Sequence, residues 1–348
     1  MELFHGGDWA GFERKYGTMP LDFSASISPL GLPEGVRAAV IESLKDAERY
    51  PDPLCRALRA ALAEHHGVPM EAIVCGNGAA DLIWRLCRAL RPKKAALFVP
   101  CFTEYERALR AEDCEIVCIP LPEAADFRLT AETAALIPED TELLFLCNPN
   151  NPTGLPAERS ALRLCRERCR TLVADECFLE FCEQADAHSL IGALAEDPAL
   201  VILRAFTKTF AMPGLRLGYA LCGSAQLTES LQSAAQPWAV SGPAQAAGRA
   251  ALREKDYVNR LRDLVSAERR RMIPALESLG FRVIPGEANY LLFRAEDPAL
   301  CAKLREKGIL LRSCGDFAGL DAHWVRAAVR TGEENDRLLK ALGEVLHG

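Results

Sequence analysis

Short apolar runs alternate with helical patterns between about residue 70 and residue 240. The runs that have the length of strands cover residues 72–75, 95–99, 115–119, 142–147, 171–175, 200–204 and 217–222. Segments of helical periodicity separate them, for example residues 79–90 and 158–169. Strands that alternate with helices indicate βαβ units. We therefore expect an α/β fold with a mostly parallel seven-stranded sheet sandwiched by helices.

The pattern changes after residue 243. A helical segment covers about residues 244–279, and strand-like segments follow at 289–294, 309–312 and 324–329, with helices at about 298–307 and 333–346. We expect a large domain at 31–245, whose first helix contributes to a small α+β domain at 246–348. The first 30 residues are rich in Gly, Pro and Ser and are expected to be an arm over the active site rather than a folded unit.

The overall composition narrows the class of protein. The apolar fraction of 49% and charged fraction of 26% are typical of a globular protein, and the net charge of −7 disfavours a nucleic-acid partner. No apolar stretch approaches the roughly 18–20 residues that span a membrane, and the N-terminus lacks a secretory pattern. The 14 cysteines form no CxxC pair and lie mostly in apolar runs, as buried thiols of a reducing compartment do. We expect a cytoplasmic protein without a metal or membrane partner.

Polar residues follow several predicted strands directly. Asn148-Pro149-Asn150-Asn151-Pro152-Thr153-Gly154 follows one, Asp175 ends the next, and Thr207-Lys208 follows a third. The first segment is also compatible with an ordinary turn, and a lysine at a strand end is often only a solvated surface group. Together they match the needs of pyridoxal phosphate: a lysine that binds it covalently, a carboxylate at its pyridine nitrogen, a donor at its ring oxygen and a phosphate cradle. Lys208, Asp175, Asn151 and the group around Thr207 and Arg216 supply these.

A glycine-rich turn offers a further part of the cradle. Gly76-Asn77-Gly78-Ala79 follows a predicted strand and opens a predicted helix. The first backbone N–H groups of a helix have no partner within the helix and can bind an anion.

With these motifs and the Pro213–Tyr219 segment PGLRLGY, the chain resembles fold-type I pyridoxal-phosphate enzymes of the aspartate aminotransferase superfamily. It is similar to histidinol-phosphate aminotransferases and most similar to the L-threonine-O-3-phosphate decarboxylases of cobalamin biosynthesis. The narrower signals for the decarboxylases are His5-Gly6-Gly7, Leu21-Asp22-Phe23-Ser24-Ala25, Ser28-Pro29-Leu30-Gly31, Arg49-Tyr50-Pro51-Asp52 and Ile309-Leu310-Leu311-Arg312-Ser313-Cys314.

The resemblance implies roles in cofactor binding. Lys208 matches the lysine that binds the cofactor, Asp175 the partner of the pyridine nitrogen, and Asn151 the donor to the ring oxygen. Phe102 matches the aromatic residue stacked on the ring, and Gly78, Ala79, Thr207 and Arg216 match the phosphate cradle. Tyr50 matches a tyrosine that reaches the cofactor phosphate of the neighbouring subunit, which implies a homodimer with shared active sites.

The resemblance also implies substrate contacts. Arg326 matches the arginine that binds the substrate carboxylate, with Asn151 beside it. Residues that contact the phosphorylated substrate match His5, Gly6, Ser26 and Arg312.

Four positions depart from the common family pattern. Phe178 replaces a tyrosine of the aminotransferases, as it does in the decarboxylases, and Ala205 replaces a hydroxyl residue of the phosphate cradle. Ser26 and Ser28 replace two asparagines.

The expected reaction is decarboxylation of L-threonine O-3-phosphate to (R)-1-amino-2-propanol O-2-phosphate, or of L-serine O-phosphate to ethanolamine phosphate. The alternative is a histidinol-phosphate or related class I/II aminotransferase. In such enzymes the bond at Cα that stands perpendicular to the cofactor ring is the one broken. The groups that hold the phosphate and the carboxylate of the substrate therefore select the reaction. A regulatory cofactor-binding domain is disfavoured, because the chain has a full catalytic set and no helix-turn-helix extension.

Overall fold

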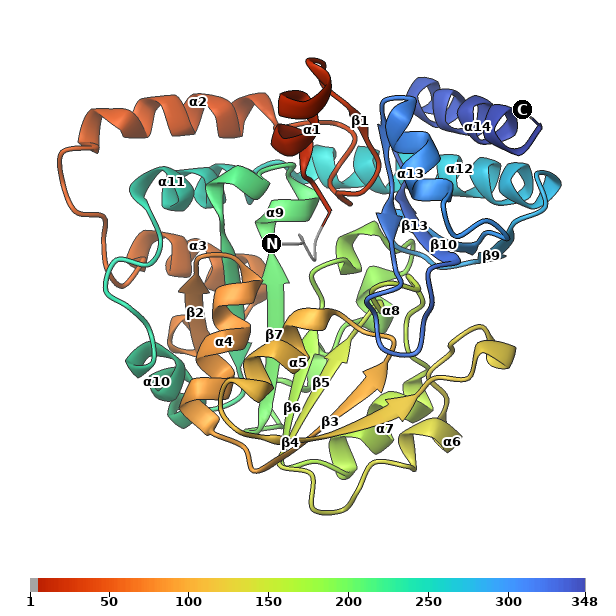
Figure 1. The fold of residues 1–348 in the computed structure, drawn as a ribbon. Helices are drawn as coiled ribbons and strands as arrows, with labels where there is room; N and C mark the ends of the chain where they lie inside the picture. The colour runs from red at the N-terminus through yellow and green to blue at the C-terminus, as the bar shows by residue number, and fades with distance from the viewer. Residues whose placement is uncertain (1–5, 348) are drawn as a thin grey trace.

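The computed structural model describes residues 6–347, and its centre is a seven-stranded sheet (Figure 1). The strands are β2 (Ile73–Gly76), β3 (Lys94–Val99), β4 (Glu115–Pro120), β5 (Leu143–Cys147), β6 (Thr171–Asp175), β7 (Leu200–Ala205) and β8 (Gly218–Cys222). Their spatial order is β2-β8-β7-β6-β5-β3-β4, and β8 runs in the direction opposite to the other six strands. The expected fold class and all seven strands are confirmed, with each strand end within one residue of the prediction.

Helices cover both faces of this sheet, because side chains of successive strand residues point to opposite faces. One face packs against α4 (Ala79–Leu90), α5 (Thr103–Arg110) and α10 (Ala225–Ser233). The other packs against α3 (Arg56–His66), α7 (Arg159–Glu167) and α11 (Gly242–Ala251). Both faces are therefore apolar, which explains the continuous apolar runs of the strands.

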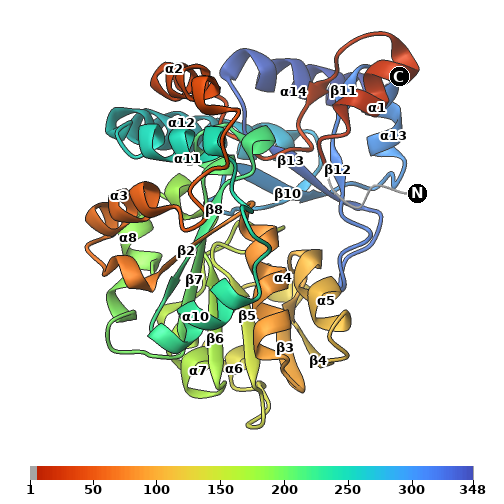
Figure 2. The ribbon, with the colours of Figure 1, turned by 90° about the vertical axis from the view of Figure 1, so that its left-hand side faces the viewer.

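A second, four-stranded sheet lies beside the carboxyl ends of the first (Figures 1 and 2). It is antiparallel and contains β12 (Arg312–Ser313), β13 (Trp324–Ala328), β10 (Tyr290–Arg294) and β9 (Arg282–Ile284), in that order. The helices α12 (Lys255–Ser278), α13 (Leu300–Glu306) and α14 (Gly332–His347) accompany it. The three-residue strand β9 was not predicted, because a run this short carries no clear alternation.

The N-terminal segment is more ordered than the sequence indicated. It contains α1 (Trp9–Tyr16) and β1 (Leu21–Asp22), two short elements that the sequence analysis did not predict. Strand β1 pairs in parallel with β11 (Ile309–Leu310), and both figures place this segment beside the C-terminal elements. Because the partner strand is almost 290 residues away in the chain, the local sequence around residue 21 gives no indication of this pairing. The same pairing divides the strand expected at 309–312 into β11 and β12.

Two further features bear on the earlier expectations. All fourteen cysteines are free, and ten of them are buried. Among residues 6–347, no helix is long and apolar enough to cross a membrane.

Candidate active site

A cavity of about 760 Å³ lies where the carboxyl ends of the central strands face the second sheet. This volume is within the range of pockets that hold a cofactor and a small substrate. Most of the predicted site residues line it: Gly6, Ser26, Ala79, Phe102, Asn151, Asp175, Thr207, Lys208, Arg216, Arg312 and Arg326.

The register of the central sheet brings the strand-end residues together. Cys147 of β5 pairs with Asp175 of β6, and Asp175 pairs with Leu203 of β7. Asn151 follows the first of these strands, and Lys208 follows the last on the short helix α9 (Phe206–Thr209). Parallel strands of one sheet end at the same edge, so residues that are widely separated in sequence share one cavity.

Asp175 is buried and carries two hydrogen bonds to its carboxylate. The Tyr105 hydroxyl donates to Oδ2 at 2.7 Å, and the Cys177 backbone N–H donates to Oδ1 at 3.0 Å. Within residues 6–347, no lysine or arginine forms an ion pair with it, whereas the adjacent Glu176 pairs with Arg204 at 2.7 Å. A buried carboxylate needs such compensation. Asp175 therefore suits a ligand that brings a positively charged N–H group.

Lys208 has the properties of a nucleophilic amine. The pKa of Lys208 is lowered to about 8. The main cause is the burial of its ammonium group away from water, and the second is the positive charge of Arg326. The Lys208 side chain still reaches the cavity, and its Nζ lies 5.8 Å from the centre of the Phe178 ring. A lysine that is partly neutral near physiological pH can attack a carbonyl group.

Two arginines of the second sheet line the opposite wall. Arg312 of β12 and Arg326 of β13 pair directly across the two strands. Arg326 is buried, and it donates to Asn151 Oδ1 at 2.5 Å and to the Ser24 carbonyl at 3.2 Å. Arg312 pairs with Asp316 at 2.7 Å. Two guanidinium groups side by side can bind a substrate with two anionic groups.

The glycine-rich turn and Arg216 form the third part of the site. Gly78 caps α4 with φ +83°, and a Cβ atom there would lie 2.6 Å from an Arg216 terminal nitrogen. The guanidinium therefore lies directly against the start of the helix. A helix N-terminus and an arginine together make an anion site, as a cofactor phosphate requires. The cavity thus has the donor set that pyridoxal phosphate needs.

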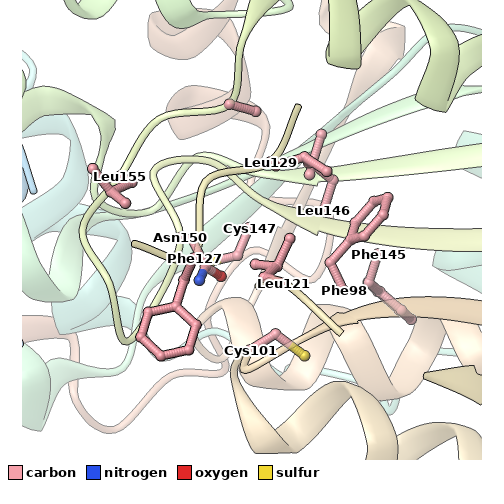
Figure 3. A pocket seen from close by; sticks show the side chains of 11 residues that line it. Phe98, Cys101, Leu121, Phe127, Leu129, Phe145, Leu146, Cys147, Asn150 and Leu155 are labelled. Carbon is pink, nitrogen blue, oxygen red and sulfur yellow. The ribbon is translucent and has the colours of Figure 1, made fainter. Parts of the chain in front are cut away.

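A small cavity lined mostly by apolar side chains lies beside the loop that carries Asn151, and Asn150 and Leu155 of this loop line it (Figure 3). Its volume of about 20 Å³ has room for little more than one water molecule, so it is not a ligand site. Next to this cavity, the Asn150 side chain donates a hydrogen bond to the Pro100 carbonyl at 3.0 Å. This bond joins the Asn151 loop to the turn before Phe102.

Two of the predicted site residues that the structure describes, Gly78 and Tyr50, do not line the cavity. Gly78 does not itself line the cavity but touches Arg216, as described above. Tyr50 is 80% exposed and stacks on Trp238 with ring centroids 4.5 Å apart, away from the cavity of its own chain. His5 lies outside the described residues.

Sequence reasoning missed several residues of the site. Tyr105, which holds Asp175, follows Phe102 by three residues on α5 and resembles an ordinary core aromatic residue. Glu104 and Arg107, an ion pair at 2.6 Å, also line the cavity, as do Trp9 and Asp22. The i,i+3 spacing of Glu104 and Arg107 just after a strand end is the signal that could have indicated them.

The buried amine of Lys208 should make the cofactor-free protein less stable than a variant without it. The folded protein holds this proton only below about pH 8, whereas an unfolded lysine holds it up to about pH 10.5. Lys208→Met should raise the free energy of unfolding by at most about 3 kcal/mol below pH 8, and the gain should shrink as the pH rises toward 10.5. Urea unfolding at pH 7, 9 and 10 checks this.

The surface variant Lys45→Met controls for the substitution itself. Equal stability of Lys208→Met and the unsubstituted protein at pH 7 would contradict a destabilised ammonium at this position.

The comparisons with known proteins agree with this geometry. The family model "Aminotransferase class I and II" matches residues 18–342. The chain is 39% identical to a threonine-phosphate decarboxylase of Salmonella typhimurium, across 100% of this chain and 99% of the relative. It is 36% identical to a histidinol-phosphate aminotransferase of Desulfitobacterium hafniense, across 92% and 91%.

A solved structure of L-threonine-O-3-phosphate decarboxylase from Porphyromonas gingivalis has 26% identity and a TM-score of 0.82, covering 94% of this chain and 99% of that one. Enzymes of this class depend on pyridoxal 5′-phosphate, and the residues around the cavity fit that group. The chain belongs to the aminotransferase class I and II family and is a pyridoxal-phosphate-dependent enzyme.

Proposed function

We propose that this enzyme decarboxylates L-threonine O-3-phosphate to (R)-1-amino-2-propanol O-2-phosphate. The observation that carries the proposal is the pair Arg312 and Arg326, which face each other across β12 and β13 at the cavity. The substrate has both a phosphate and a carboxylate, so each arginine would bind one anionic group of the substrate. The full-length identity to a threonine-phosphate decarboxylase supports the same reaction.

The cofactor is proposed to occupy the side of the cavity formed by the central sheet. Lys208 would bind it covalently, Asp175 would accept from its pyridine N–H, and Asn151 would donate to its ring oxygen. Phe102 would stack on its ring, and its phosphate would be held by Gly78, Ala79, Thr207 and Arg216. When bound, pyridoxal phosphate accepts the electron pair of the substrate bond that stands perpendicular to its ring.

The protein's own residues then decide which bond that is. Arg326 is proposed to hold the carboxylate, and Arg312, with Gly6, Ser26 and His5, to hold the phosphate. Two fixed anions leave the α carbon little freedom to rotate, so the carboxylate stays in the reacting orientation. The substrate amine would displace Lys208 from the cofactor, so that the freed Nζ could return a proton to the α carbon after carbon dioxide leaves.

The reaction is tested by comparing two products in one assay. Carbon dioxide release is measured with L-threonine O-3-phosphate and with L-serine O-phosphate, and amino transfer from histidinol phosphate to 2-oxoglutarate is measured in parallel. We expect carbon dioxide release to dominate, and the ratio of kcat/KM values for the two phosphorylated amino acids gives the substrate preference. Efficient transfer without carbon dioxide release would replace the decarboxylase by the aminotransferase alternative.

Gly78→Ala should weaken cofactor binding at least tenfold. The added Cβ would occupy space 2.6 Å from Arg216, at a backbone φ of +83°. Gly67→Ala is the matched control, because Gly67 also has a positive φ of +66° but no atom within 4 Å of the added Cβ. Cofactor dissociation constants come from the visible absorbance of the bound group. Equal affinities of the two variants would argue against a cradle at Gly78.

Arg312→Ala should lower kcat/KM for the phosphorylated substrate about 10- to 100-fold, since a bond between charged groups contributes about 1.5–3 kcal/mol. The same variant should retain the cofactor and should increase the minor share of amino transfer, seen as pyridoxamine phosphate. Arg163→Ala, on the exposed face of α7, controls for the loss of a surface charge. If Arg312→Ala left kcat/KM for decarboxylation unchanged, the substrate phosphate would have to be bound by another residue.

We further propose a homodimer that shares its active sites. Large apolar side chains are exposed on α2 (Glu34–Ser43), on the segment after it and at one distant position: Ile41, Leu44, Tyr50, Leu54 and Trp238. Tyr50 and Trp238 line a groove of about 980 Å³ that runs between this segment and α11. In the proposed dimer, the second copy would cover these exposed apolar side chains.

Mixing two inactive variants tests the sharing. Lys208→Ala and Tyr50→Ala chains should each be nearly inactive, but one site of a mixed dimer contains both residues, so activity should return on mixing. Sedimentation of the unsubstituted enzyme as a fully active monomer, or no recovery on mixing after subunit exchange, would rule out shared sites.

We retain the proposed division into an arm (1–30), a large domain (31–245) and a small domain (246–348). It is supported by the two sheets, which use residues 73–222 and 282–328. We also propose a cytoplasmic location, for which fourteen free thiols are well suited.

A further inference from the structure

Ser24, on the loop after β1, is buried and uses every polar group that it has. Its backbone N–H donates to Asp22 Oδ1 at 2.8 Å, and its hydroxyl donates to the same oxygen at 2.6 Å. The hydroxyl oxygen accepts from the Gly7 N–H at 2.8 Å. The Ser24 carbonyl accepts from Arg326 at 3.2 Å. Ser24 therefore contacts the Gly6–Gly7 segment of the arm, Asp22 of the first strand and Arg326 of the second sheet.

The directions of these bonds are determined by Asp22. An ionised carboxylate only accepts hydrogen bonds, so the single hydroxyl proton of Ser24 must point toward Asp22. The lone pairs of the hydroxyl are then left for the Gly7 N–H. Asp22 itself is held by the pairing of β1 with β11. The hydrogen bond from the Gly7 N–H to Ser24 is thus oriented by a residue that is fixed in a strand.

The two glycines of the arm fit this contact for different reasons. A Cβ on Gly6 would lie 2.2 Å from the Ser24 carbonyl oxygen, so only glycine allows the arm to approach. Gly7 has φ +93°, a conformation that other residues rarely adopt. Gly6 and Gly7 both line the active-site cavity, and Trp9, at the start of α1, lines it as well. The position of this wall therefore depends on Ser24.

The same residue orients Arg326. One terminal nitrogen of the guanidinium is held by Asn151 and the other by the Ser24 carbonyl, while its plane lies near the Tyr290 ring at 5.0 Å. Its Nε is buried and has no hydrogen-bond partner among residues 6–347. The guanidinium is thus held at its two ends, and Ser24 provides one of them.

We propose that Ser24, aligned by Asp22, is a positioning residue that couples the Gly6–Gly7 segment of the N-terminal arm to the carboxylate-binding arginine. Its hydroxyl holds Gly6 and Gly7 as one wall of the substrate pocket, and its carbonyl sets the direction of Arg326. The inference rests on the proposed function only for the role of Arg326 toward the substrate. Substrate affinity should depend on Ser24, while cofactor affinity should not.

The first test is amide hydrogen exchange of residues 6–12 in the cofactor-loaded enzyme without substrate. Ser24→Ala should exchange at least tenfold faster at Gly7, because that N–H loses its acceptor. Asp22→Ala should have the same effect through the unaligned hydroxyl. Asp22→Asn keeps an accepting Oδ1 and should restore slow exchange. Ser278→Ala removes an exposed hydroxyl that bonds only the Ala275 carbonyl, and it serves as the control.

The second test separates binding from turnover. Ser24→Ala should raise KM for the phosphorylated amino acid about tenfold, with kcat changed less than threefold and the cofactor dissociation constant unchanged. Gly6→Ala should act in the same way. The double variant should be less impaired than the product of the two single effects, since both substitutions release the same contact.

The outcomes distinguish this inference from the proposed function. Unchanged exchange at Gly7 in both Ser24→Ala and Asp22→Ala would overturn the contact between Ser24 and the arm, whatever reaction the enzyme catalyses. Faster exchange with an unchanged KM in both Ser24→Ala and Gly6→Ala, for whichever of the two substrate classes is turned over, would overturn the role of the Gly6–Gly7 segment and its contact with Ser24 in substrate binding. Absence of carbon dioxide release from the unsubstituted enzyme would contradict only the proposed function.

Discussion

A single buried carboxylate imposes the strongest constraint on this structure. Asp175 ends a central strand, is largely buried and forms no ion pair with a lysine or arginine among the described residues of its own chain. The cost of removing its charge from water is reduced only in part by the Tyr105 hydroxyl and one backbone N–H. The adjacent Glu176 is compensated within the chain by Arg204, so the two acids have opposite roles. Glu176 stabilises the fold, and Asp175 is left for a ligand.

The two sheets contribute different parts of the chemistry. The central sheet presents Asp175, Lys208 and the glycine-rich turn at its strand ends, and these are the residues proposed to bind the cofactor. The second sheet presents Arg312 and Arg326 from two neighbouring strands, and these are the residues proposed to bind the substrate. In this proposal, the second sheet and the N-terminal segment orient the substrate anions, because both line the cavity opposite the cofactor residues.

Most of the central sheet could be predicted from sequence, because strands buried on both faces appear as unbroken apolar runs between turn residues. The strand-end residues Asn151, Asp175 and Lys208 could be placed together for the same reason. Strand β1 could not, since its partner β11 is distant in the chain. Tyr105 was missed because an aromatic residue on a helix next to a sheet usually indicates core packing.

The pairing of β1 with β11 has a consequence for the order in which the chain folds. During synthesis, Phe12 and Phe23 leave the ribosome early, but Arg305, which lies over the Phe12 ring, and Leu310, which accepts from the Phe23 N–H, are made only near the end of the chain. The central sheet is complete by residue 222 and can fold first, while these two aromatic rings remain exposed to solvent or to chaperones. The segment that is made first is thus among the last to fold, and the active site closes only when nearly the whole enzyme has been translated.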